Sequence, residues 1–285
     1  MTEAGTSADI NLKEKTGHKQ PSRTSRMFRA FIGRFDAARD REVMDDLTRW
    51  VEQTYREELE ARPSKHVYVR NLPADVASKI DQLRDNDIVY TAVLEQFASG
   101  SVITPMKQTD ELYISHYNRD YGGDHGLFSR HYDGNLRFMP VGAVVRSLIY
   151  LQSDATYKVV FGDSRVEKAF ETYDFGILDF HKELHWVEGD FNPDDKQRIL
   201  LKCNYLVAPK NAVWIARALL AANTGVFYVV KAAMEYSKSP KTPTQRVVGY
   251  GCNIMRLLNN IHPVVPLALI AALLALAAWG LVLLF

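Results

Sequence analysis

A few residues in the middle of the chain have types and spacing that suit metal-dependent chemistry. His131 and Asp133 stand two positions apart, so on an extended segment both side chains project from the same face. His185 closes a later apolar run, and Arg198 opens the next one. Two imidazoles and one carboxylate that leave coordination positions open are the ligand set with which non-haem Fe(II) activates oxygen. The pattern therefore predicts a metal site built from His131, Asp133 and His185.

The segments around these residues are strand-like. A tyrosine-bearing stretch, 111–117, precedes His131, the apolar stretch 146–151 follows it, and Gly176 lies in the stretch before the second histidine. The ordered set of His-x-Asp, a distal His and then a basic residue, in this setting, resembles the Fe(II)/2-oxoglutarate-dependent dioxygenase superfamily. The pattern looks similar to that of its prolyl-hydroxylase-like members, although many of these have a lysine at the position of Arg198. The resemblance covers about the middle third of the chain.

The resemblance implies a fold, two cofactors and roles for further residues. The fold would be a double-stranded β-helix, a cupin-like jelly roll, that holds Fe(II) and 2-oxoglutarate. Arg198 would bind the distal carboxylate of 2-oxoglutarate, where a planar guanidinium meets a planar anion. Tyr117 and Tyr150 could supply a hydroxyl to the same carboxylate. Because halogenating members lack the carboxylate ligand, Asp133 favours hydroxylation or a related oxidation, with 2-oxoglutarate decarboxylated to succinate.

Several of these assignments have rivals in the same sequence. His181 lies just after an apolar stretch and could replace His185, although the Trp-Val sequence after His185 fits the family pattern better. Lys202 would point to the same face of a strand as Arg198, and Arg146 lies on a neighbouring predicted strand. Each histidine could also be an ordinary polar residue at a strand end, and each tyrosine a core aromatic with a satisfied hydroxyl.

The rest of the chain divides by its composition. Residues 1–26 are polar and predict a disordered tail. Apolar residues at three- and four-residue steps predict a helix over 27–60, with a strand at 66–70 and a second helical region at 73–97. We therefore expect residues 27–100 to be a helical support region. Residues 101–210 contain short β-branched and aromatic stretches between turn residues, which predicts the catalytic β core. The fold class is mainly β with flanking helices.

The C-terminal part predicts membrane attachment. Residues 263–285 carry no charge, and this length suits a transmembrane helix better than a buried core helix. Basic residues in the preceding linker, 237–262, favour a tail anchor with the catalytic domain in the cytosol. Residues 211–236 are apolar but contain Arg217, so an interfacial or packed helix is favoured over a second span.

Composition excludes some functions and leaves others open. Lys and Arg total 35 against 34 Asp and Glu, and there are two cysteines, which argues against a nucleic-acid demethylase and against a disulfide scaffold. The sequence thus predicts a membrane-anchored oxygenase that uses O2 and an organic substrate, which could be a lipid, another small molecule or a peptide. No nucleic-acid partner is expected. The alternatives are a prolyl-hydroxylase-like protein hydroxylase and a non-catalytic, membrane-tethered jelly-roll scaffold.

Overall fold

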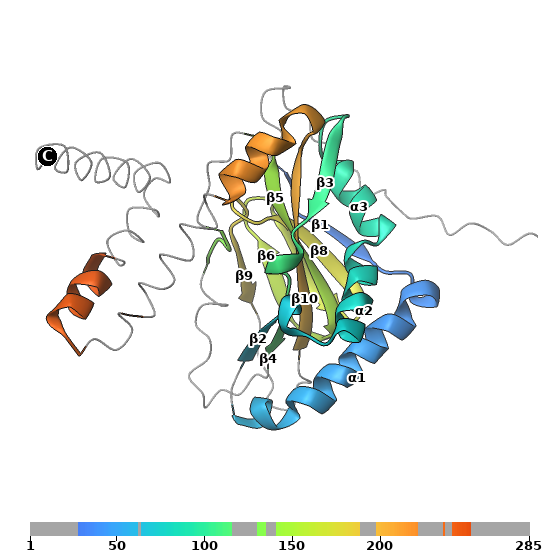
Figure 1. The fold of residues 1–285 in the computed structure, drawn as a ribbon. Coiled ribbons are helices and arrows are strands. Elements are labelled where there is room, and N and C mark those ends of the chain that lie inside the picture. Colours follow the sequence, from blue (N-terminus) through green and yellow to red (C-terminus); the bar gives the residue numbers. More distant parts are fainter. Residues whose placement is uncertain are drawn as a thin grey trace, which may run out of the picture.

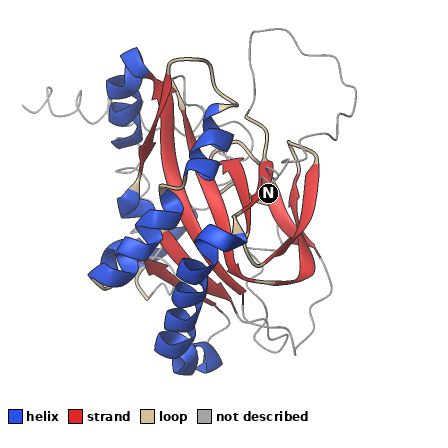
Figure 2. Ribbon diagram, turned by 90° about the vertical axis from the view of Figure 1, so that its right-hand side faces the viewer, coloured by secondary structure: helices blue, strands red, loops and turns tan. Residues whose placement is uncertain are grey.

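The structure is a computed structural model, and it describes the chain over residues 28–61, 64–115, 130–134, 141–188, 198–221, 236 and 241–251. The described part consists mainly of β-strands in two sheets, with helices on one side (Figures 1 and 2). The expectation of a mainly β protein with flanking helices is confirmed. The proposed tail, 1–26, and the proposed anchor, 263–285, lie outside the described residues. Among the helices that are described, none has the length and apolar character to cross a membrane.

The larger sheet has seven strands, and every pair in it is antiparallel. Its central strands are long and apolar, as expected of strands covered on both faces. In spatial order the strands are β1 (Phe31–Arg34), β8 (Asp174–Asp179), β5 (Ala143–Gln152), β10 (Arg198–Pro209), β4 (Glu111–Ser115) and β2 (Ser64–Tyr68), with β3 (Ser101–Pro105) also paired to β10.

Helices cover one face of this sheet (Figure 2). They are α1 (Ala37–Ala61), α2 (Ala74–Arg84) and α3 (Asp87–Leu94). Met44, Leu47 and Val51 recur at three- and four-residue steps on α1, and all three are buried in one core cluster with Ile149 and Ile177 of the sheet. The predicted helices thus support the sheet from one side.

The helix predicted over 27–60 is wrong at its start. Residues 31–34 form β1 on the edge of the sheet, and α1 begins only at Ala37. The aromatic side chains of Phe31 and Phe35 recur at a helical interval, but both pack against Phe175 of β8. The helical interval between these aromatic residues therefore arises from a strand and the residues that follow it.

The smaller sheet lies on the other side of the larger one. It contains β7 (Val166–Glu171), β6 (Asp154–Phe161) and β9 (His185–Glu188) in that order. A second core cluster fills the space between the sheets, with Tyr113 and Tyr150 from the larger sheet and Tyr157 and Phe170 from the smaller one. Two sheets packed through such a core are consistent with a jelly roll.

The segment after β10 is helical. Residues 210–212 form a 3-10 turn and residues 213–221 a helix. Ala216 is buried in a small cluster with Val144 and Leu206, whereas Trp214 is 71% exposed. Within the predicted segment 211–236, residues 213–221 therefore pack on the sheet by one side. Residues 243–251, within the predicted linker, are also helical.

Candidate metal centre

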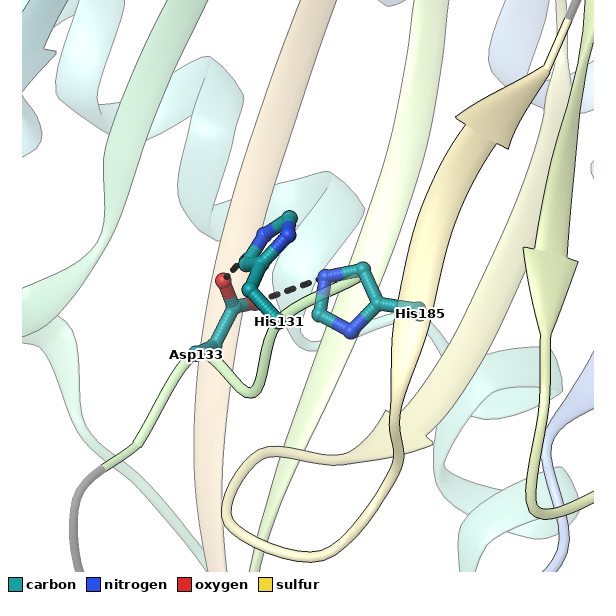
Figure 3. Close-up of side chains that lie close together, drawn as sticks. All are labelled: His131, Asp133 and His185. Carbon is teal, nitrogen blue, oxygen red and sulfur yellow. Dashed lines mark ion pairs between the residues drawn. The ribbon is translucent and has the colours of Figure 1, made fainter. Parts of the chain in front are cut away.

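Three side chains from two distant segments meet beside the smaller sheet (Figure 3). One ligand atom from each of His131, Asp133 and His185 lies within 4.8 Å of the other two. Nε2 of His131 is 3.7 Å from Oδ1 of Asp133, and Nε2 of His185 is 3.6 Å from Oδ2. Both imidazoles therefore point a ring nitrogen at the same carboxylate, as ligands of one ion would.

Backbone pairing brings the two segments together. The peptide N–H of His131 donates to the carbonyl of His185 at 3.1 Å, and the reverse bond is 3.0 Å. This antiparallel bridge continues the smaller sheet beyond β9. The next contact is made by Gly134, whose N–H donates to the carbonyl of Phe180 at 2.8 Å. A Cβ at Gly134 would lie 1.9 Å from Nδ1 of His181, so the close approach of the segment requires glycine there.

His185 is oriented by a backbone carbonyl. Its Nδ1 lies 3.1 Å from the carbonyl oxygen of Glu183, so an N–H at Nδ1 donates to that oxygen and Nε2 keeps its lone pair for a metal. Burial lowers the pKa of the His185 imidazole, which favours the neutral form that metals bind.

Glu183 itself is held firmly. Its carboxylate accepts hydrogen bonds from the peptide N–H groups of Asp163 and Ser164, at 3.1 and 3.0 Å, and from the Ser164 hydroxyl at 2.6 Å. This fixes the backbone just before His185. Sequence reasoning did not identify Glu183, because its partners lie in a turn between β6 and β7 and nothing in its local sequence signals that contact.

Asp133 has a cation beside it. Nη1 of Arg146, on β5, lies 2.8 Å from Oδ2 of Asp133. Burial raises the pKa of the Asp133 carboxyl, but the guanidinium charge of Arg146 opposes this most strongly, and the pKa lies well below its ordinary value. Asp133 is therefore ionised, and the site offers a metal two imidazoles and one carboxylate.

The rival histidine takes no part in this group of ligand atoms. His181 lies in the turn after β8, where it is 2% exposed and packs edge-on against Phe180. Burial lowers the pKa of His181 to about 4. The structure thus places His185, and not His181, opposite His131 and Asp133.

Arg198 lies between the two sheets. Its Nε donates to the Ser115 hydroxyl at 3.1 Å, and its guanidinium carbon is 4.9 Å from the ring centre of Tyr157 and 5.3 Å from that of Tyr113. Arg198 is 8% exposed, and over the described residues no carboxylate forms an ion pair with it. A buried cation of this kind is suited to an anionic ligand.

The two rivals of Arg198 already have anionic partners. Nζ of Lys202 lies 3.0 Å from Oε1 of Glu111, and Arg146 is paired with Asp133. As expected from strand alternation, Lys202 lies on the same face of β10 as Arg198. Either rival would have to give up an ion pair to bind a ligand carboxylate.

The two candidate tyrosines have different outcomes. Tyr150 is fully buried, and its ring stacks on Phe170 with the centroids 4.3 Å apart. Burial raises the pKa of its hydroxyl, which therefore stays protonated and able to donate. Tyr117 lies outside the described residues, so its role stays a prediction.

Comparison by sequence finds no family profile that matches the chain and no similar curated protein. Solved structures do match. The epimerase SnoN of nogalamycin biosynthesis, described as non-haem and α-ketoglutarate-dependent, is 13% identical and has a TM-score of 0.43, over 62% of this chain and 78% of its own.

Two further matches come from named organisms. A prolyl hydroxylase from Trichoplax adhaerens, solved with a peptide from hypoxia inducible factor, is 12% identical, with a TM-score of 0.41, over 67% of this chain and 86% of its own. HygX from Streptomyces hygroscopicus, solved with nickel and 2-oxoglutarate, is 13% identical and has a TM-score of 0.39. The match covers 62% of this chain and 82% of HygX.

Similarity at this level does not assign a function, which has to come from the residues of the site. In its packed sheets and in the grouping of His131, Asp133 and His185, the chain resembles the Fe(II)/2-oxoglutarate-dependent oxygenase superfamily.

Proposed function

We propose that the protein is an Fe(II)/2-oxoglutarate-dependent oxygenase that hydroxylates or otherwise oxidises an organic substrate, and that its two sheets form a double-stranded β-helix. The observation that carries this proposal is the convergence of His131, Asp133 and His185. Two imidazoles and an ionised carboxylate on one side of an ion leave the opposite coordination positions for a 2-oxo acid and O2.

The donor set fits the metal. Nε2 of His185 is the ring nitrogen left for coordination, because Nδ1 faces a carbonyl oxygen. The ionised carboxylate of Asp133 supplies the negative charge that attracts a divalent cation. When bound, Fe(II) supplies the activation of O2 that couples decarboxylation of 2-oxoglutarate to succinate with oxidation of the substrate.

Arg198 is the proposed partner of the distal carboxylate of 2-oxoglutarate. An arginine buried among Tyr113, Tyr157 and Ser115 needs a counter-charge, and the planar guanidinium can meet a carboxylate through two parallel hydrogen bonds. The hydroxyls of Tyr150 and, by resemblance, Tyr117 are proposed to donate to the same anion.

The substrate and the location are finer proposals. The uncharged sequence 263–285 and the exposed Trp214 on the helix after β10 support attachment to a cytosolic membrane surface and a lipid or other hydrophobic substrate. The prolyl-hydroxylase-like sequence pattern supports a peptide substrate instead. Turnover of 2-oxoglutarate by the full chain in detergent, stimulated by lipid extracts or by a proline-rich peptide library, separates the two.

The first test of the proposal is spectroscopic. The full chain, purified in detergent without oxygen, is given Fe(II) and 2-oxoglutarate, and a weak visible charge-transfer band of chelated 2-oxo acid is expected. His131→Ala and His185→Ala should abolish the band, whereas His181→Gln, the matched control, should keep it. Failure of the folded wild-type protein to bind iron would leave the non-catalytic scaffold as the better explanation.

A further inference from the structure

We propose that Arg146 is a positioning residue, which holds Asp133 so that one carboxylate oxygen binds the metal, and that Asn204 and Asp110 fix Arg146 from behind. The inference rests on the proposed function, since it concerns the same metal. In the sequence analysis Arg146 was a rival of Arg198 for the carboxylate of 2-oxoglutarate. Here its partner is instead the proposed metal ligand Asp133.

The contact between Arg146 and Asp133 makes the two carboxylate oxygens of Asp133 different from each other. Nη1 of Arg146 is 2.8 Å from Oδ2, which also faces Nε2 of His185 at 3.6 Å, whereas Oδ1 faces Nε2 of His131 at 3.7 Å. Because the charge-assisted hydrogen bond uses one lone pair of Oδ2, we assign Oδ1 as the oxygen that binds the metal. A carboxylate that donates a single oxygen leaves a coordination position open, which a two-oxygen ligand would fill.

Arg146 is itself held from two further sides. Its Nε donates to Oδ1 of Asn204 at 3.0 Å, and the two residues are direct cross-strand partners in β5 and β10. The guanidinium carbon lies 4.4 Å from the ring centre of Phe180. Because Phe180 also accepts the hydrogen bond from Gly134, the same turn supports both the arginine and the segment that carries Asp133.

The orientation of Asn204 is fixed in turn. Its Nδ2 donates to the carbonyl oxygen and to the hydroxyl of Thr109, both at 3.1 Å. A carbonyl can only accept, so the amide nitrogen must face Thr109 and the amide oxygen must face Arg146. The peptide N–H of Asn204 donates to Oδ1 of Asp110 at 2.9 Å.

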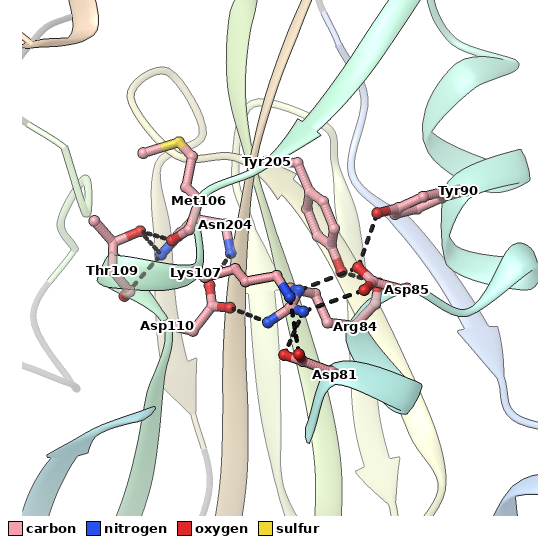
Figure 4. Close-up of polar contacts among 10 residues, drawn as sticks. All are labelled: Asp81, Arg84, Asp85, Tyr90, Met106, Lys107, Thr109, Asp110, Asn204 and Tyr205. Atoms are coloured by element: carbon pink, nitrogen blue, oxygen red, sulfur yellow. Dashed lines mark hydrogen bonds and ion pairs between the residues drawn. The ribbon is translucent and has the colours of Figure 1, made fainter. Parts of the chain in front are cut away.

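Asp110 carries the network to the helical face of the sheet (Figure 4). The 3-10 turn Lys107–Thr109 separates β3 from β4 along β10, and Asp110 follows that turn directly. Its second oxygen, Oδ2, lies 3.2 Å from Nη1 of Arg84 at the end of α2, a side chain with no exposed surface. Polar contacts thus run from helix α2 to a proposed metal ligand.

Arg84 is anchored by its own helix and by the sheet. Nε and Nη2 of Arg84 donate to the two oxygens of Asp85, and Asp81 forms another ion pair with it. The hydroxyl of Tyr205, on β10, donates to the carbonyl oxygen of Arg84 at 2.7 Å. The far end of the network is therefore bonded both to α2 and to the sheet, which suits a positioning role for Arg146.

A metal titration tests the inference without any turnover. Co(II) is titrated calorimetrically into the full-length protein in detergent, with no 2-oxoglutarate, and its visible spectrum is recorded. Arg146→Lys keeps the charge, but its single nitrogen cannot reach both Asp133 and Asn204. We expect its Co(II) affinity to fall about 10-fold or more, the usual effect of removing a residue that orients a ligand, with a changed Co(II) spectrum.

Arg146→Gln separates charge from position. Loss of a cation near the site would by itself raise the affinity for Co(II), so a fall in affinity reports lost positioning. The matched control is Arg34→Gln, which removes an arginine–aspartate pair of similar length, with Asp174, at the edge of the same sheet. The control should bind Co(II) like the wild type. If Arg146→Gln does not fold by circular dichroism, Arg146→Lys decides alone.

The outcomes are distinct. Wild-type affinity and spectrum in Arg146→Lys would overturn this inference and leave the proposed function intact. Normal Co(II) binding together with lost 2-oxoglutarate binding would show that Arg146 is an anion-binding residue and would overturn its positioning role. A folded wild-type protein that binds no Co(II) would overturn the proposed function and the inference together.

Discussion

The carbonyl oxygen of Glu183 lies 3.1 Å from Nδ1 of His185, while the Glu183 carboxylate holds the turn at 163–164. One residue therefore links a proposed metal ligand to the connection between β6 and β7. The two functions use different parts of Glu183, since its backbone orients the imidazole and its side chain fixes the backbone.

This relationship predicts that Glu183→Ala weakens both folding and metal binding. Three partly buried hydrogen bonds to the carboxylate are lost, each contributing roughly 1 kcal/mol, so the free energy of unfolding should fall by about 2–4 kcal/mol. Co(II) affinity should fall as well, because the carbonyl that orients His185 becomes mobile. Chemical denaturation and calorimetry measure the two effects. Ser164→Ala removes the hydroxyl contact with Glu183 and the acceptor of the Ala30 N–H, but it keeps both peptide hydrogen bonds to the carboxylate, so it should show near-normal Co(II) binding.

Arg198→Met should separate binding of 2-oxoglutarate from binding of metal. The guanidinium is proposed to bind the distal carboxylate and does not contact the three ligands, so the dissociation constant for 2-oxoglutarate should rise about 100-fold at unchanged Co(II) affinity, as for loss of one charged hydrogen-bonding partner. An anaerobic titration with 2-oxoglutarate, monitored by the charge-transfer band, measures this dissociation constant. The comparison is Lys202→Met, which disrupts the pair with Glu111. A larger effect from Lys202→Met would move the carboxylate site from Arg198 to Lys202.

Gly134→Ala should disrupt the centre by steric conflict. The added methyl group would lie 1.9 Å from His181 and 2.6 Å from Phe180, so the segment after Asp133 has to move away from β8. Overpacking of this kind destabilises by about 1–3 kcal/mol, and metal affinity should fall because Asp133 moves with its neighbour. Gly251→Ala, where a methyl group meets open space, is the control and should leave the melting temperature and Co(II) binding unchanged.

The lowered pKa of buried His181 predicts that the free energy of unfolding decreases at acidic pH. Burial lowers the pKa of His181 from 6.5 to about 4 in the folded protein. Between these values the unfolded chain binds a proton that the folded protein does not, so the free energy of unfolding falls as pH falls, by up to about 1.4 kcal/mol per pH unit. His181→Gln should make the decrease from pH 6.5 to pH 4 shallower than in the wild type. Comparison of the two proteins at pH 8, where the histidine is neutral in both states, reports any packing change. Parallel curves over this range would contradict the prediction.

Local sequence determined the types of element and the residues with chemical potential. Apolar runs rich in β-branched residues identified β5 and β10 as strands, and apolar residues at helical spacing, among them Leu47 and Val51, identified α1. The pair His131 and Asp133 was visible because two positions on an extended segment share a face. Residues 31–34 were misassigned because aromatic side chains at helical intervals also fit a strand followed by a turn.

Tertiary structure decided which of the candidates meet. The sequence favoured His185 over His181 only by its resemblance to a family pattern. The antiparallel bridge to His131 places His185 at the carboxylate. The sequence placed Arg198 ahead of Lys202 and Arg146, but it could not give the partners of these residues. Those partners, Ser115, Glu111 and Asp133, come from separate segments. Residue type and period are local properties of a chain. Partners are set by strand register and sheet packing, which depend on the whole core.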